Sequence, residues 1–425
     1  MLSDASTGSF RWNKSIVGVL AISSGITQLI GLTATLVLGH LYSPSEYGQY
    51  SVAINVASVI APLLTFSMEI FIVPAKSDME ARSYTLRILK VMLRNFVVLF
   101  ICAVVLQNVQ FGVQSHSIKI STGLLAGLVL AFLYAIFSVV TQILLREQEF
   151  RKLAVRNPIQ ISLIAAFQFT LSAPGTRSFG LILGEYFGRV AGIAFLAKRA
   201  LRILKGWRLS STTEEIKLNK YSQIMVNFVS IVFDLLSVSA IIFFTSIFFS
   251  HSDVGHVAMA QRILSFPTVL FGTVFSQYLL SKGASELRNG RRLNSRDFNS
   301  ILRPLISIGI LILGIIYFTL PFGIRAFLGE SWLQSINAIN SLILATLISF
   351  IWSPLSALFY VYRKWNGFLL VSAVRFVFIL IAAAFSRFEG MTLGSSLVTI
   401  SLSASVAQLG GIWYLRQLCA KHPNS

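Results

Sequence analysis

Long apolar runs, separated by short polar segments, follow one another along almost the whole chain. Each run has roughly the 20 residues that an α-helix needs to cross a bilayer, and none alternates apolar and polar positions as a membrane β-strand does. The pattern predicts an all-α polytopic membrane protein with about 12 transmembrane helices. The expected spans are Ser15–Leu41, Tyr50–Val73, Ile88–Leu106, Thr122–Leu145, Leu153–Leu171, Phe179–Ala200, Ser222–Phe249, Val257–Leu280, Leu305–Pro321, Ile336–Tyr360, Phe368–Phe385 and Leu393–Leu415.

The composition leads to the same class of protein. Of the 425 residues, 55% are hydrophobic and only 12% are charged, whereas a soluble domain carries about twice that share of charge. The apolar surface therefore needs lipid as its solvent.

The basic residues predict the orientation in the membrane. With both termini assigned to the cytoplasm, 28 of the 35 Lys and Arg residues fall on the cytoplasmic side of the expected spans, as the positive-inside rule requires. We expect a multi-pass protein with both termini cytoplasmic. Topology and contact with anionic membrane lipids account for the net charge of +19, so no nucleic acid is expected as a partner.

A short motif occurs twice. Residues 42–53, after the first span, and residues 249–260, after the seventh, both read aromatic-Ser-x-Ser-acid-x-Gly, with Ala five residues later. Chance similarity in a turn-prone segment is the alternative to a true repeat. Within each motif the acid suits a helix N-terminus and the glycine permits close packing, so we expect a structural role for Pro44, Glu46, Gly48, Asp253 and Gly255.

The repeat divides the chain into two lobes of six spans each. Six is an even number, so the lobes share one orientation and are parallel repeats around a central cavity, as in many secondary transporters. The expected divisions are an N-lobe over residues 1–204, a cytoplasmic linker over 205–220 and a C-lobe over 221–425.

Few charged residues lie at membrane depth, where each costs roughly 2.5–3.5 kcal/mol on insertion scales and so requires an explanation. The basic ones come from both halves, and in a central cavity they would bind an anionic group such as a phosphate. The complete set is Glu69, Glu185, Arg189, Asp234, Arg262 and Arg375.

Arg262 and Arg375 have no acid near them in the sequence, which favours substrate binding. Arg189 follows Glu185 by four residues, so this pair could equally be a structural salt bridge. Asp234, Glu69 and Glu185 could carry a coupling proton or sodium ion, or could simply accept hydrogen bonds.

Motifs of catalysis are not found in the sequence. It has no Walker-type phosphate loop and no CxxC or HExxH metal site, and the outer loops are too short to build a catalytic constellation. We therefore expect neither an enzyme nor a cofactor or metal ion.

Four segments together resemble the Wzx-type polysaccharide flippases, a family of the multidrug/oligosaccharidyl-lipid/polysaccharide exporter superfamily. Residues 41–48 are similar to its L-[ST]-P-x-x-[FY]-G signature, and residues 144–151 to its "qr..rf" element. Residues 253–262 resemble the repeat after span 7, and residues 329–332 the G-x-x-W element before span 10. His251 departs from the pattern, because it replaces a second proline.

The resemblance implies two six-helix lobes around a cavity and export of a polyprenyl-diphosphate-linked oligosaccharide, such as an O-antigen or a capsule or exopolysaccharide repeat unit. Arg262 falls on the family element after span 7, which implies a role in substrate binding. The resemblance also implies the cytoplasmic (inner) membrane of a bacterium as the location, and glycan polymerase and glycosyltransferases as protein partners.

Two other functions remain open from the sequence. A multidrug-type, cation-coupled antiporter of the same superfamily would usually place an acid in the first span, and this chain has none there. A non-transporting membrane scaffold for glycan assembly would not need charges in a cavity.

Overall fold

The computed structural model describes residues 14–73, 75, 77–108, 117–173, 177–207, 218–288, 295–362 and 364–420. Its first half contains α1 (Lys14–Leu41), α2 (Pro44–Thr65), the 3₁₀ helix η1 (Met68–Phe71), α3 (Asp78–Asn108), α4 (Ser117–Arg146), α5 (Phe150–Thr170) and α6 (Arg177–Gly206). Its second half contains α7 (Leu218–Phe248), α8 (His251–Arg288), α9 (Ser295–Phe327), η2 (Glu330–Trp332), α10 (Gln334–Leu355), α11 (Ala357–Val361), α12 (Trp365–Phe388) and α13 (Leu393–Ala420).

Each predicted span has its counterpart among these helices, and the all-α class is confirmed. The tenth span consists of α10 and the short α11, which follow one another around Pro354. Ten segments are long and apolar enough to cross a membrane by length and composition. Within the described residues, helices α5 and α8 are not among these segments.

The predicted end of the second span, at Val73, is wrong. Helix α2 ends at Thr65, where Phe66 and Ser67 adopt left-handed backbone conformations with φ of 51° and 52°. The short helix η1 follows. Pro62 cannot donate a backbone hydrogen bond within the last turn of α2, so the helix is already weakened there. Glu69 therefore lies in η1 and not in a continuous transmembrane helix.

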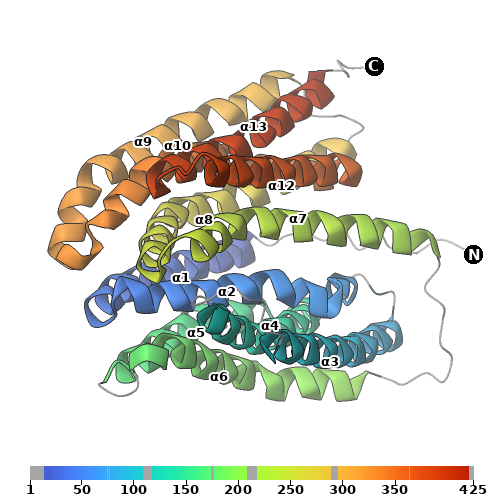
Figure 1. Ribbon diagram of the computed structural model, residues 1–425. Helices are drawn as coiled ribbons and strands as arrows, with labels where there is room; N and C mark the ends of the chain where they lie inside the picture. The colour runs from blue at the N-terminus through green and yellow to red at the C-terminus, as the bar shows by residue number, and fades with distance from the viewer. Residues whose placement is uncertain are drawn as a thin grey trace, which may run out of the picture.

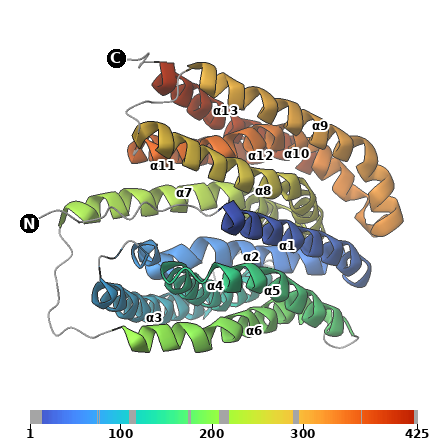
Figure 2. The same cartoon turned by 180° about the vertical axis from the view of Figure 1, so that it is seen from behind.

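The helices form two lobes of six spans. In both views α1–α6 gather in one half of the molecule and α8–α13 in the other, with α7 along the boundary (Figures 1 and 2). We call the end with the α1–α2 and α7–α8 turns the turn end, and the end where α6 finishes and α7 begins the linker end. Most of the predicted linker, residues 208–217, lies outside the described residues.

Among the described residues, the hydrophobic cluster shared by the two lobes lies toward the turn end. There, Leu38 and Tyr47 of the N-lobe belong to the same buried cluster as Val257 and Trp332 of the C-lobe. Trp332 also donates a hydrogen bond of 2.8 Å from Nε1 to the carbonyl oxygen of Gly39 on α1. At the linker end, by contrast, the largest clusters each belong to one lobe, although the end of α2 touches α7 through the rings of Phe66 and Phe228.

The repeated motif forms the same helix start in both lobes. At the start of α2, the backbone N–H of Ser43 donates to Glu46 Oε2 at 2.7 Å, and the N–H of Glu46 donates back to Ser43 Oγ at 3.4 Å. At the start of α8, Ser250 and Asp253 make the same reciprocal bonds at 3.1 and 3.2 Å. These capping boxes satisfy backbone donors that would otherwise be unpaired at the helix N-termini.

The glycines of the two motifs bring the lobes into direct contact. A Cβ atom at Gly255 would overlap the carbonyl oxygen of Pro44, and one at Gly48 would overlap that of His251. The obstructing atoms belong to the backbone, so they cannot move aside as a side chain could. Helices α2 and α8 can therefore cross this closely only because both motifs carry glycine.

We predict that Gly255→Ala destabilises the protein by about 1–3 kcal/mol through overpacking between the lobes. In a helix without such a contact, Gly→Ala would stabilise by roughly 0.5–1 kcal/mol. The thermal unfolding midpoint of the purified protein in detergent measures the effect. Gly314→Ala in α9 is the control, because its Cβ would meet no atom within 4 Å; equal midpoints for the two variants would contradict the prediction.

Candidate functional site

A cavity of about 660 Å³ lies between the two lobes. Helices α1, α2 and α4–α6 supply its N-lobe wall, and α7, α8, α10, α12 and α13 supply its C-lobe wall. Three arginines and two carboxylates carry charge on these walls: Glu185, Arg189, Asp234, Arg262 and Arg375. Five of the six charges expected at membrane depth thus line one cavity.

Arg262 presents an exposed side chain to this cavity. It follows Gly255 by seven residues, or about two turns of α8, so the helix crossing at the turn end fixes its position. Its Nη2 would be 3.0 Å from a Cβ at Gly31, on α1 of the other lobe. Within the described residues, its guanidinium makes no salt bridge, and a cation at membrane depth without a counter-ion is unfavourable.

Arg189 and Glu185 form a salt bridge on α6, with 2.6 Å from Nε to Oε1. The Tyr50 hydroxyl donates to Glu185 Oε2 at 2.9 Å, and the Tyr134 hydroxyl donates to Oε1 at 3.3 Å. The Arg189 guanidinium lies 3.7 Å from the centre of the Tyr134 ring. Only 5% of the Glu185 side chain is exposed, so this carboxylate is fully committed to its neighbours.

Arg375 is also paired, although no acid lies near it in the sequence. The fold brings Asp234 of α7 beside it, with 3.1 Å from Arg375 Nη1 to Asp234 Oδ1. The arginine side chain is 11% exposed and the aspartate side chain is 36% exposed. Arg262 is therefore the one arginine of the cavity wall that has no acidic partner among the described residues.

Glu69 lies apart from the cavity lining. Ser138 Oγ on α4 donates to its Oε1 at 3.1 Å, and its Oε2 is buried without a hydrogen bond in the described part of the chain. The three carboxylates that we considered for ion coupling thus occupy three different surroundings.

Two features of the N-lobe were not expected from the sequence. Arg156, which lies within the predicted fifth span but is not among the charges expected at membrane depth, is buried within α5. It donates to Thr141 Oγ1 at 2.7 Å and lies 4.0 Å from the centre of the Phe137 ring. Tyr50 and Tyr134 were not singled out either, although a tyrosine within an apolar span indicates a buried hydroxyl that needs a partner.

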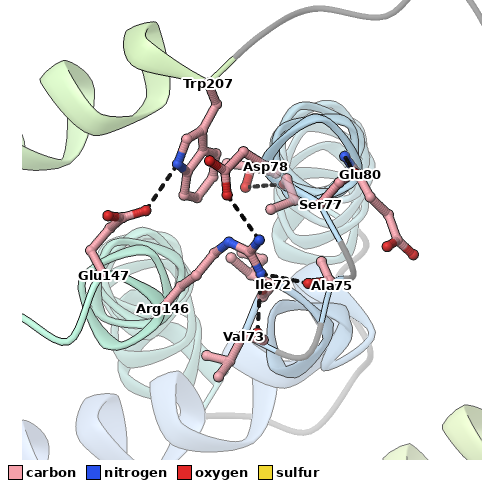
Figure 3. Close-up of polar contacts among 11 residues, drawn as sticks. Ile72, Val73, Ala75, Ser77, Asp78, Glu80, Arg146, Glu147 and Trp207 are labelled. Atoms are coloured by element: carbon pink, nitrogen blue, oxygen red, sulfur yellow. Dashed lines mark hydrogen bonds and ion pairs between the residues drawn. The ribbon is translucent and has the colours of Figure 1, made fainter. Parts of the chain in front are cut away.

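The segment that resembles the "qr..rf" element joins several helix ends at the linker end (Figure 3). Arg146, the last residue of α4, donates to the carbonyl oxygens of Ile72, Val73 and Ala75 at 3.2, 3.2 and 2.7 Å and forms a 2.9 Å salt bridge with Asp78.

Trp207, just after α6, completes this junction. Its ring centre lies 5.7 Å from the Arg146 guanidinium carbon, and its Nε1 donates to Glu147 at 3.0 Å (Figure 3).

Glu149, in the same segment, is also held by basic side chains. A hydrogen bond from Lys152 keeps the pKa of Glu149 below its usual value, with a smaller contribution from Arg199. Residues 144–151 therefore hold the end of α6, from which the linker continues.

We predict that Glu185→Ala lowers the free energy of unfolding by about 3–5 kcal/mol, because it leaves Arg189 as an uncompensated buried charge. The double variant Glu185→Ala/Arg189→Met should recover part of that loss, since it removes both charges. Unfolding of the purified variants in detergent tests this. A double variant less stable than Glu185→Ala alone would show that the charge pair is not the cause.

The sequence matches the family model for polysaccharide biosynthesis proteins over residues 37–337. No curated protein sequence matches the chain closely enough to be counted as a relative.

Several solved structures have a similar fold. The lipid II flippase MurJ in an inward closed conformation is 15% identical, with a TM-score of 0.71 over 93% of this chain and 86% of that one. A MATE structure in the straight conformation is 16% identical, with a TM-score of 0.61 over 95% of both chains. A MOP superfamily transporter from Pyrococcus furiosus is 13% identical, with a TM-score of 0.54 over 95% of both chains. At these identities the likeness concerns the fold alone.

Proposed function

Because the chain belongs to the polysaccharide biosynthesis protein family, we propose that it is a flippase for a lipid-linked oligosaccharide. Its proposed substrate is a polyprenyl-diphosphate-linked repeat unit of an O-antigen, a capsule or an exopolysaccharide. The protein carries this molecule across the cytoplasmic membrane of a bacterium by alternating access.

The observation that carries the proposal is that Arg262 has no acidic partner among the described residues. A guanidinium binds phosphate oxygens through two parallel hydrogen bonds and always keeps its charge. Since the salt bridges occupy Arg189 and Arg375, Arg262 is the group available for the diphosphate. The glycan occupies the cavity beside it, while the polyprenyl chain stays in the lipid.

The arrangement of the cores supports alternating access. The lobes share a buried cluster toward the turn end and have separate clusters at the linker end, so separation of the lobes at the linker end disturbs less packing. The excess of Lys and Arg assigns the linker end to the cytoplasm. With the linker end open the lobes receive the glycan from the cytoplasm, and rocking of the lobes then separates them at the turn end and exposes the glycan outside.

The charge of the cavity favours this substrate over that of a multidrug antiporter. Three arginines against two carboxylates leave a positive excess, which repels an organic cation. A scaffold without transport would not need a charged cavity between two lobes. Glycosyltransferases on the cytoplasmic side and a glycan polymerase on the outer side are the proposed protein partners, alongside the membrane lipids.

We expect Arg262→Gln to reduce glycan export at least about tenfold, because hydrogen bonds to charged groups contribute roughly 1.5–3 kcal/mol and 1.4 kcal/mol corresponds to tenfold. Lipid-linked glycan should then accumulate in the inner leaflet, as it should on deletion of the gene. Surface glycan and lipid-linked intermediates are measured in cells that express each variant at equal levels.

Arg262→Lys, which keeps the charge, should retain part of the export. Arg325→Gln is the matched control, because this exposed arginine of α9 lies outside the cavity lining. Normal export without accumulation in both the deletion strain and the Arg262→Gln strain would refute the proposed function.

A further inference from the structure

We propose that the cavity selects an uncharged glycan and that the exposed carboxylate of Asp234 rejects acidic sugars. The inference rests on the proposed flippase function and concerns the specificity of the same cavity.

The charges of the cavity wall leave no cation for an acidic sugar. Arg189 is held by Glu185 and Arg375 by Asp234. Once the diphosphate engages Arg262, every arginine of the described cavity lining has an anionic partner. A uronic acid in the glycan would then be an unpaired anion in a partly desolvated site, which is unfavourable.

The two salt bridges present different faces to the cavity. In the N-lobe pair the carboxylate is the hidden member, because 5% of the Glu185 side chain and 20% of the Arg189 side chain are exposed. In the C-lobe pair the carboxylate is the accessible member, with 36% of Asp234 exposed against 11% of Arg375. A substrate in the cavity therefore meets an anion at Asp234.

Asp234 also keeps the capacity to accept hydrogen bonds. Arg375 engages its Oδ1, and its Oδ2 makes no hydrogen bond within the described residues. An ionised carboxylate only accepts hydrogen bonds, so it pairs with the hydroxyl groups of a neutral sugar and repels another carboxylate.

The wall around Asp234 suits a neutral, hydroxyl-rich ligand. Hydroxyl side chains line the C-lobe side of the cavity, and each can both donate and accept hydrogen bonds. They include Ser237, Ser265, Thr268, Thr346, Ser349 and Ser353. None of them supplies the positive charge that an acidic sugar needs.

The experiment compares two probes in proteoliposomes that contain the purified full-length protein. Both probes are polyprenyl-diphosphate oligosaccharides, identical except that one hexose is a hexuronic acid in the second. We expect the wild-type protein to translocate the neutral probe about tenfold faster than the acidic one, since like charges placed together at an interface are strongly unfavourable.

Two double variants separate the effect of the exposed carboxylate from that of the net charge. Asp234→Asn/Arg375→Gln and Glu185→Gln/Arg189→Gln each remove one salt bridge and leave the net charge of the cavity unchanged. The first should raise the acidic-to-neutral ratio of rates about tenfold, to near equality. The second should leave the ratio as in the wild type, because its carboxylate is hidden. Asp234→Glu, which keeps the carboxylate, should preserve the preference for the neutral probe.

Three outcomes would overturn the inference while leaving the flippase function intact. They are equal rates for both probes in the wild type, an unchanged ratio in Asp234→Asn/Arg375→Gln, and equal changes of the ratio in the two double variants. If Asp234 and Arg375 only stabilise the protein and do not select the substrate, the ratio should be unchanged in Asp234→Asn/Arg375→Gln. Failure of the wild type to move either probe would instead reject the flippase function, and this inference with it.

Discussion

The close crossing of α2 and α8 is the contact on which the arrangement of the lobes depends. Two glycines, Gly48 and Gly255, let the backbones of the repeated helix starts touch. This contact joins the lobes at the turn end, and Trp332 reinforces it with its hydrogen bond to Gly39. The cavity lies beyond the crossing, and Arg262 lies about two helical turns along α8 from it. The same two motifs thus hold the lobes together and fix the position of Arg262 in the cavity wall.

The second constraint is the cost of charge at membrane depth. The protein offsets this cost at Arg189 and at Arg375 by pairing each arginine with a carboxylate. It does not offset this cost at Arg262 within the described residues, which is why we propose that an anionic ligand completes the cavity electrostatically. In the proposed function a lipid-linked diphosphate provides that anion, and the positive excess of the cavity disfavours an organic cation.

The sequence predicts what is encoded locally. Span positions follow from apolar runs, the capping of α2 follows from Ser43 and Glu46, and the pairing of Glu185 with Arg189 follows from their spacing of four residues on one helix. It does not predict the pairing of Asp234 with Arg375, because these residues are 141 positions apart and meet only through the packing of α7 on α12. For the same reason the sequence does not predict the burial of Arg156, which depends on the helices around α5.

The central claim is that the lobes must separate at the turn end for substrate to leave. A disulfide across this end tests it most directly, with Gly39→Cys on α1 and Leu328→Cys just after α9, two residues whose side chains would touch. The native Cys102 and Cys419 are first replaced by serine, and translocation of a neutral polyprenyl-diphosphate oligosaccharide is measured in proteoliposomes. The account predicts that oxidation stops translocation and that reduction restores it. Translocation by the oxidised protein at the rate of the reduced protein would contradict the account.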